Sequence, residues 1–316
     1  MDVVATQPMR RPRFRRASEP LAFRLTDADI EIVRHVARHR FLRSTHIAAL
    51  VGRSLDRTND RLQRLFHAGY IDRPRAQLDY YPCSGSAPFV YALADRGARL
   101  LRDHDGIAFA NPECSRKNRR AGRPFIEHQI EIAEFRVALQ GSVAQRSDIR
   151  LISPEEMNPS ASRQQMLKGS ASFSFRAKLT HHGKLREISV VPDFVFGLRL
   201  ANGERRNYVV EIDRGTMPIT RSDIDQTSVE RKLRVYLAAH AAKQHQLRYR
   251  WKNFRVLVLT TSDDRQHSMI EASRRLTSGI GKNPVLFLFK RTELLTLADP
   301  LDAAWFDGAG REEVLL

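Results

Sequence analysis

Cysteine is scarce in this sequence of 316 residues, which has Cys83 and Cys114 alone. Two cysteines exclude a disulfide-stapled scaffold and a zinc module with four cysteine ligands. The longest apolar strand core covers residues 285–289, far short of the ~20 apolar residues that cross a bilayer. Residues 1–16 contain arginines but lack the apolar core of a secretory signal. We therefore expect a cytoplasmic protein that makes no contact with a membrane.

Two catalytic motifs are also missing. The sequence has no GxxxxGK[ST] loop, which argues against ATP-driven chemistry. It has no HExxH motif either, and the pair His181 and His182 lacks cysteine partners. A zinc hydrolase is therefore not expected.

Negative charge is in short supply. Lys and Arg number 53 against 36 Asp and Glu, which gives a formal net charge of +17. Such a surplus favours a polyanionic partner, most often nucleic acid, although a merely basic protein is the alternative. With 42% apolar and 28% charged residues the chain is typical of globular proteins, and its length predicts two domains.

Residues 25–104 show the pattern of a small DNA-binding domain. Apolar residues at helical spacing predict a helix after Thr26, a second after Ser44 or Thr45, and a third over residues 54–68. Two short apolar segments, around Ile71 and at residues 89–93, predict a β-hairpin. Three helices and a hairpin make a winged helix-turn-helix. Residues 1–24, where arginines and prolines crowd, are expected to form a basic disordered tail.

The third expected helix separates an apolar stripe from a row of arginines. Leu55, Thr58, Leu62 and Leu65 share one face. An arginine row on the opposite face is what entry into the major groove of duplex DNA requires. The alternatives are a solvated face paired with Asp56 and Asp60, or a surface for protein contacts. The DNA-binding residues predicted on this helix and the wing are Arg53, Ser54, Arg57, Asn59, Arg61, Arg64, Arg73 and Arg75.

The second half of the chain alternates expected strands and helices. Residues 105–124 are rich in arginine and interrupted by glycine and proline, which predicts a basic linker. Residues 125–316 then have the pattern of an α/β domain with a mixed sheet. Its expected helices cover residues 124–139, 225–242 and 263–277, and its expected strands 151–153, 173–177, 188–200, 208–213, 254–261 and 284–290. A turn at Asn202-Gly203 joins two of these strands into a hairpin.

Three carboxylates fall on the two strands of that hairpin. Asp193 precedes Glu211 by 18 residues, and Asp213 shares the face of Glu211. Converging carboxylates repel one another unless a cation lies between them, and oxygen ligands suit Mg²⁺ or Mn²⁺. We therefore predict a metal site of Asp193, Glu211 and Asp213. The alternative is that Asp193 and Glu211 form salt bridges with Arg199, Arg205 or Arg214.

A Pro-Asp on one strand followed by Glu-X-Lys on the next resembles the PD-(D/E)XK nuclease superfamily. Asp193 and Glu211 match that pattern, and Asp213 stands where the lysine is expected. The resemblance implies a nuclease-like core in which Lys232, or else Arg214, replaces the lysine. It also implies a further glutamate from an early helix, for which we favour Glu131 over Glu127 and Glu134. The implied catalytic residues are Asp193, Glu211, Lys232 and Glu131.

Several longer segments resemble the replication-relaxation family: LTDADI at residues 25–30, LFHAGYI at 65–71, GSAPFVYAL at 85–93 and EIDRGT at 211–216. The resemblance implies a bacterial mobile-element protein in plasmid replication, DNA relaxation or mobilisation. Its expected partners are double-stranded DNA and other plasmid replication or mobilisation proteins. Two alternatives remain: a Mg²⁺-dependent DNA nickase targeted by its winged helix and, more weakly, a transcriptional repressor.

Overall fold

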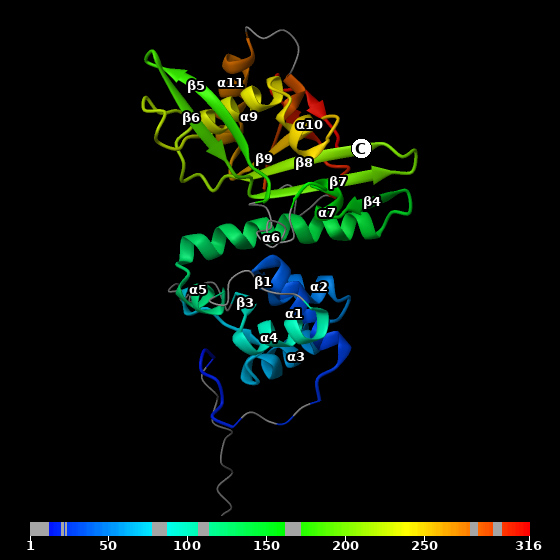
Figure 1. Cartoon of the computed structure of the whole chain (residues 1–316). Coiled ribbons are helices and arrows are strands. Elements are labelled where there is room, and N and C mark those ends of the chain that lie inside the picture. The colour runs from blue at the N-terminus through cyan, green and yellow to red at the C-terminus, as the bar shows by residue number, and fades with distance from the viewer. Residues whose placement is uncertain are drawn as a thin grey trace, which may run out of the picture. The chain divides into compact units, whose positions relative to one another are not determined.

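The computed structural model describes residues 13–19, 22, 24–77, 87–106, 114–161, 172–278, 284–292 and 299–316. The protein is a mixed α+β chain that divides into two compact units, Met1–Ala133 and Glu134–Leu316 (Figure 1). The division falls inside one long helix, α6 (Arg123–Ala144). Within the described ranges no helix has the length and apolar character needed to cross a membrane.

The first unit combines helices with a small antiparallel sheet of strand order β1-β3-β2. This agrees with the predicted three helices followed by paired strands. The outer part of the predicted wing, residues 78–86, lies outside the described residues. The elements of the unit before α6 are α1 (Asp27–His39), β1 (Phe41–Arg43), α2 (Ser44–Leu50), α3 (Leu55–His67), β2 (Ile71–Asp72), a 3-10 helix (Arg75–Gln77), β3 (Val90–Leu93), α4 (Asp95–Asp105) and α5 (Cys114–Arg120).

Local sequence explains where these helices begin and which face they bury. Thr26 is the N-cap of α1, and its backbone N–H donates to the Asp29 carboxylate at 2.8 Å, as a capping box requires. On α3 the buried face is formed by Thr58, Leu62, Leu65 and Phe66. Leu55, predicted to belong to that stripe, is 41% exposed, so the buried face starts one turn later.

The segment predicted as a linker, residues 105–124, is partly helical. It contains α5, and α6 begins at Arg123. Ser115 and Asn118 of α5 are buried, and Arg119 donates to the Asp72 carboxylate at 3.3 Å. Positions 115, 118 and 119 of the helix, spaced i, i+3 and i+4, hold it to the first unit. Its exposed positions are basic, which is why the sequence resembles a linker.

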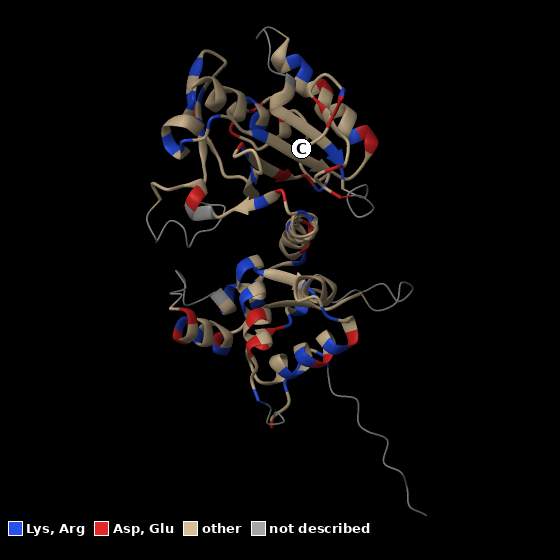
Figure 2. Ribbon diagram, turned by 90° about the vertical axis from the view of Figure 1, so that its right-hand side faces the viewer, with Lys and Arg blue, Asp and Glu red and all other residues tan. Residues whose placement is uncertain are grey.

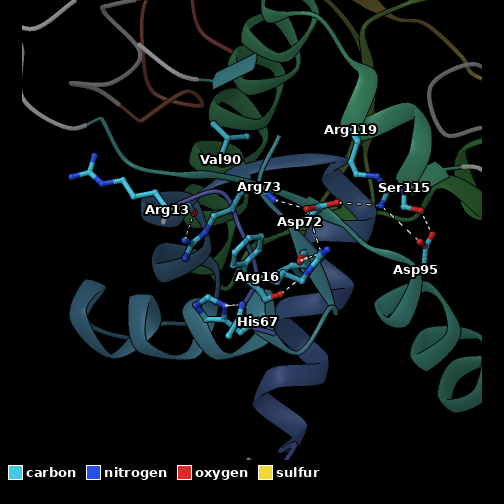
Figure 3. Close-up of polar contacts among 12 residues, drawn as sticks. Arg13, Arg16, His67, Asp72, Arg73, Val90, Asp95, Ser115 and Arg119 are labelled. Carbon is cyan, nitrogen blue, oxygen red and sulfur yellow. Dashed lines mark hydrogen bonds and ion pairs between the residues drawn. The ribbon is translucent and has the colours of Figure 1, made fainter. Parts of the chain in front are cut away.

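Part of the predicted tail is also ordered. The Arg16 Nε donates to the backbone oxygen of Phe66 at 2.8 Å, near the C-terminus of α3. The backbone N–H of Ala17 donates to Nδ1 of His67 at 3.0 Å (Figure 3). Arginine next to the last carbonyls of a helix is favourable because those carbonyls lack intrahelical partners. The expectation of disorder therefore does not hold for these residues.

The second unit is built on a seven-stranded mixed sheet of order β12-β11-β10-β9-β8-β7-β4. Strands β8, β9 and β10 are parallel, and the other neighbours are antiparallel. A separate antiparallel pair is formed by β5 and β6. The strands are β4 (Ile149–Ile152), β5 (Phe175–His181), β6 (Lys184–Val190), β7 (Phe194–Leu200), β8 (Arg205–Ile212), β9 (Arg255–Thr260), β10 (Phe287–Arg291), β11 (Trp305–Asp307) and β12 (Glu312–Glu313).

Helices cover both faces of this sheet. The helices after α6 are α7 (Pro154–Met157), α9 (Val229–Ala241), α10 (Gln244–Tyr249) and α11 (Asp263–Thr277), with a 3-10 helix at Pro284–Leu286. Val209 and Val258 belong to the same buried core as Leu233 of α9 and Ile270 of α11. On the other face, Phe196 contacts Phe135 of α6 with ring centroids 5.9 Å apart.

Two predictions about the strands differ in outcome. The turn at Asn202-Gly203 is confirmed: it joins β7 to β8, and Gly203 has a φ of 82°, which favours glycine. The single strand predicted over residues 188–200 is wrong, because β6 ends at Val190 and β7 begins at Phe194 in a different sheet. Pro192, which has no N–H to donate to a ladder, lies in the break. The elements β1, α5, α7, α10, β11 and β12 are not predicted from the sequence.

Candidate functional site

The exposed face of α3 carries the basic residues that the sequence predicts for DNA binding. Arg53, Arg57, Asn59 and Arg64 are exposed. At 3.6 residues per turn Arg57 and Arg64, seven residues apart, lie within about 20° of each other around the helix, and Arg53 comes just before the N-cap Ser54. Asp60 pairs with Arg64 at 3.1 Å, but both side chains are exposed and such pairs contribute little. This face can therefore offer guanidinium groups to a polyanion.

Arg61 is engaged elsewhere. Its Nε donates to Oδ1 of Asp29 at 2.8 Å, and its Nη2 contacts the other carboxylate oxygen. Asp29 is fully buried under α3. Burial alone would raise the pKa of Asp29, but hydrogen bonds from Arg61 and Thr26 outweigh it and leave that pKa below its usual value. The prediction for Arg61 needs correction, because this guanidinium holds α3 to α1.

Arg73 is likewise held inside the first unit. Its guanidinium lies 4.4 Å from the ring centroid of Phe66 and 4.6 Å from that of Phe89. It donates to the hydroxyl of Tyr91 at 3.1 Å and to the backbone oxygen of Arg13 at 2.9 Å (Figure 3). These contacts make Arg73 a packing residue. Ser54 and Arg75, which are also predicted DNA-binding residues, are both exposed.

In the second unit the hairpin brings Asp193 opposite Glu211, as its turn predicts. The printed strand pairing begins at Phe194 with Val210, and the backbone N–H of Asp193, just before it, also donates to the oxygen of Val210, at 3.1 Å. The Asp193 carboxylate in turn accepts the backbone N–H of Ile212 at 2.8 Å. Both carboxylates therefore lie where β7 begins and β8 ends.

Lys232 and Tyr236 of α9 complete the site around Glu211. Ser228 caps α9 by accepting the N–H of Arg231, and residues four apart on the helix then share one face. The Lys232 Nζ lies 2.6 Å from Oε2 of Glu211. The Tyr236 hydroxyl donates to the other oxygen of Glu211. The Glu211 residue as a whole is 5% exposed. Lys232, expected to replace the lysine of the nuclease pattern, therefore contacts Glu211.

Burial and charge shift the titration of this cluster. Burial raises the pKa of Glu211, the Lys232 ammonium opposes that effect, and the Asp193 carboxylate adds to it. Burial lowers the pKa of Lys232, but Glu211 and Asp193 outweigh it and leave the pKa above its usual value. Lys232 therefore stays an ammonium beside the Glu211 carboxyl group.

Asp213, the third predicted metal ligand, has other partners. Its carboxylate accepts from Nη2 of Arg265 and from the Thr260 hydroxyl, at 2.8 and 2.9 Å. In the described part of the chain, no group of three or more His, Cys, Asp or Glu residues is arranged to hold a metal ion. Asp213 is therefore paired with Arg265, which leaves Asp193 and Glu211 as the remaining predicted ligands.

Glu131 and Arg214 are the remaining residues predicted for this site. Glu131 is on the part of α6 that belongs to the first unit, whereas Asp193, Glu211 and Lys232 belong to the second. Arg214, the alternative to Lys232, is half-buried beyond the end of β8. The sequence assigned no role to Tyr236 or Arg265. Tyr236 could have been found from its spacing, since it follows Lys232 by four residues on an expected helix.

One family model matches the chain over most of its length. The family model described as replication-relaxation matches residues 33–253, which include most of the first unit and the site of Asp193, Glu211 and Lys232. The chain belongs to the replication-relaxation family. No curated protein and no solved structure is significantly similar to it. The family indicates a role in replication and relaxation.

Proposed function

We propose that this protein is a duplex-DNA-binding factor of a bacterial mobile element that acts in plasmid replication, DNA relaxation or mobilisation. The observation that carries the proposal is the exposed face of α3, where Arg57 and Arg64 lie together opposite a buried apolar face, with exposed Arg53 just before the helix. In a winged helix-turn-helix such a helix enters the major groove. The three helices and the β1-β3-β2 sheet of the first unit support that arrangement.

The charge of the chain supports the same proposal. Lys and Arg exceed Asp and Glu by 17, and basic residues recur along the ribbons of both units (Figure 2). A protein that neutralises phosphates releases condensed counterions, so its affinity for DNA falls steeply with salt. Replication or mobilisation proteins of the same element are the protein partners that this role implies.

Replacing Arg57 and Arg64 together by glutamine is expected to weaken duplex binding. If each arginine contacts one phosphate, the slope of log affinity against log salt should flatten by about two units. Fluorescence anisotropy with a labelled duplex at several salt concentrations measures this slope. Arg99→Gln is the matched control, because Arg99 is an exposed arginine of the same unit on α4. Equal slopes for the double variant and the control would remove α3 from the interface.

A second candidate function is Mg²⁺-dependent nicking of DNA, favoured by Lys232 lying 2.6 Å from Glu211, the residue opposite Asp193. Asp193 and Glu211 would hold the cation, which when bound lowers the pKa of a water molecule for attack on a phosphodiester. Lys232 is placed to stabilise negative charge that develops on phosphate oxygens. Tyr236 fixes the orientation of Glu211 through its hydroxyl.

If the second unit cuts DNA, Asp193→Asn should abolish Mg²⁺-dependent nicking of supercoiled plasmid and leave duplex affinity unchanged. The substitution removes a charge from the carboxylate pair but keeps its shape and its bond from the Ile212 N–H. Agarose gels of supercoiled plasmid with Mg²⁺, Mn²⁺ or EDTA report the activity. If the unmodified protein nicked plasmid with neither Mg²⁺ nor Mn²⁺, this candidate function would be excluded. The proposed duplex binding would not be affected by that result.

A further inference from the structure

An open pocket of about 410 Å³ lies in the first unit, and its described lining includes no residue of α3. Its described lining is almost entirely cationic or apolar, and no acidic side chain is among those residues. The lining consists of Arg40, Arg116, Lys117, Arg120, Ala121 and Phe125. Neither the α3 face nor the Glu211 site uses any of them.

The orientation of α5 places its cations in this pocket. Ser115 and Asn118 are buried, and Arg119 turns toward Asp72 and Asp95, at 3.3 and 3.7 Å (Figure 3). At 3.6 residues per turn, positions 115, 118 and 119 share the inner face, so positions 116, 117 and 120 point outward. All three outward side chains are exposed and basic. The helix therefore has one face for attachment and the other for cations.

An aromatic ring forms the apolar part of the pocket. Phe125, just inside α6, is 38% exposed, which is unusual for so large an apolar side chain. Its ring contacts Phe41 edge-on at a centroid distance of 6.3 Å. The Arg40 guanidinium lies 4.5 Å from the ring centroid and donates from Nε to Asn118 at 3.1 Å. Both the ring and the guanidinium plane beside it are thus held in place before any ligand binds.

We propose that this pocket binds a single-stranded nucleic acid. An exposed ring surrounded by cations matches the way such strands are held: bases stack on aromatic side chains or guanidinium planes while basic groups follow the phosphates. A base would stack at Phe125 and Arg40, and the flanking phosphates would contact Arg116, Lys117 and Arg120. In a duplex the bases are already stacked and paired, so the ring gives selectivity for single strands. This site goes beyond the proposed duplex binding and depends on different residues.

The test is fluorescence anisotropy of a labelled single-stranded oligothymidylate, with a duplex of equal length as the second probe. Phe125→Leu should weaken single-strand affinity by about 5-fold or more, the effect of losing one base–aromatic stack. Phe125→Trp should retain the affinity. Lys117→Gln with Arg120→Gln, on exposed side chains whose loss leaves the fold intact, should weaken binding and flatten its salt dependence. Arg99→Gln is the control and should change neither.

Three results would overturn the proposal. One is that the unmodified protein does not bind the single strand. Another is that Phe125→Leu binds it as tightly as the unmodified protein does. The third is that the pocket variants lose duplex and single-strand affinity equally, which would make the pocket part of the duplex interface. If the proposed duplex binding were wrong instead, the Arg57 and Arg64 variants would bind a duplex as tightly as the unmodified protein. That result does not depend on what the pocket variants show.

Discussion

Lys232→Met is expected to lower the free energy of unfolding by ~3–5 kcal/mol, the usual cost of removing one partner from a buried ion pair. Methionine fills a similar volume but leaves the Glu211 carboxylate buried, with the Tyr236 hydroxyl as its remaining described hydrogen-bond donor. Without the ammonium the pKa of Glu211 rises further above that of the unfolded chain. The loss should therefore be small in acid and grow as pH rises through the unfolded pKa of about 4.3.

Chemical denaturation followed by the fluorescence of Trp251 and Trp305, both buried in the second unit, measures this cost, since Trp251 and Leu233 lie in the same core. Adding Glu211→Gln to Lys232→Met should restore most of the stability, because the buried charge is then gone. A Lys232→Met protein as stable as the original at pH 8 would show that the pair is solvated. The Lys232–Glu211 pair would then not be the buried ion pair described above.

The second large effect is expected at the ion pair between α1 and α3. Arg61→Leu should destabilise the first unit by ~3 kcal/mol, because Asp29 is fully buried and would lose its partner. Circular dichroism during urea unfolding measures this, and Arg57→Leu on the exposed face of the same helix is the matched control. If Arg61→Leu lowered duplex affinity without lowering stability, Arg61 would be a DNA contact after all.

The pH dependence of this pair has a definite sign. The pKa of Asp29 in the folded protein lies below its value in the unfolded chain, since Arg61 and Thr26 outweigh the effect of burial. The contribution of the pair is therefore complete above the unfolded pKa of about 4 and is lost as pH falls through the lower folded pKa. Unfolding experiments from pH 6 to pH 2 should show a steeper acid loss for the original protein than for Asp29→Asn.

Local signals account for the parts of the fold that could be predicted from sequence. Caps and helical spacing locate α1, α3 and α11, and the Asn202-Gly203 turn fixes the register of β7 and β8. That register is what places Asp193 opposite Glu211. The approach of Lys232 was a hypothesis drawn from family resemblance, and it depends on how α9 packs on the sheet.

The features that sequence reasoning missed depend on tertiary contacts. Arg57 and Arg61 have the same local pattern, and the position of Asp29 on another helix decides which of them is exposed. In α5 the buried positions are polar, so no apolar periodicity marks the helix. The fixed position of Arg16 likewise depends on a hydrogen bond to a carbonyl about 50 residues later in the chain. Such pairings are set by the assembled fold and leave no periodic trace in the sequence.

The most direct test of duplex binding is site-specific photo-crosslinking from α3. A photoreactive benzophenone amino acid in place of Asn59, which is exposed on this helix, should crosslink to a duplex under ultraviolet light. The same amino acid in place of Arg99 on α4 should give little product. Mapping the crosslinked bases would show whether the helix lies in the major groove. Equal crosslinking from both positions, or strong crosslinking from position 99 alone, would contradict the account.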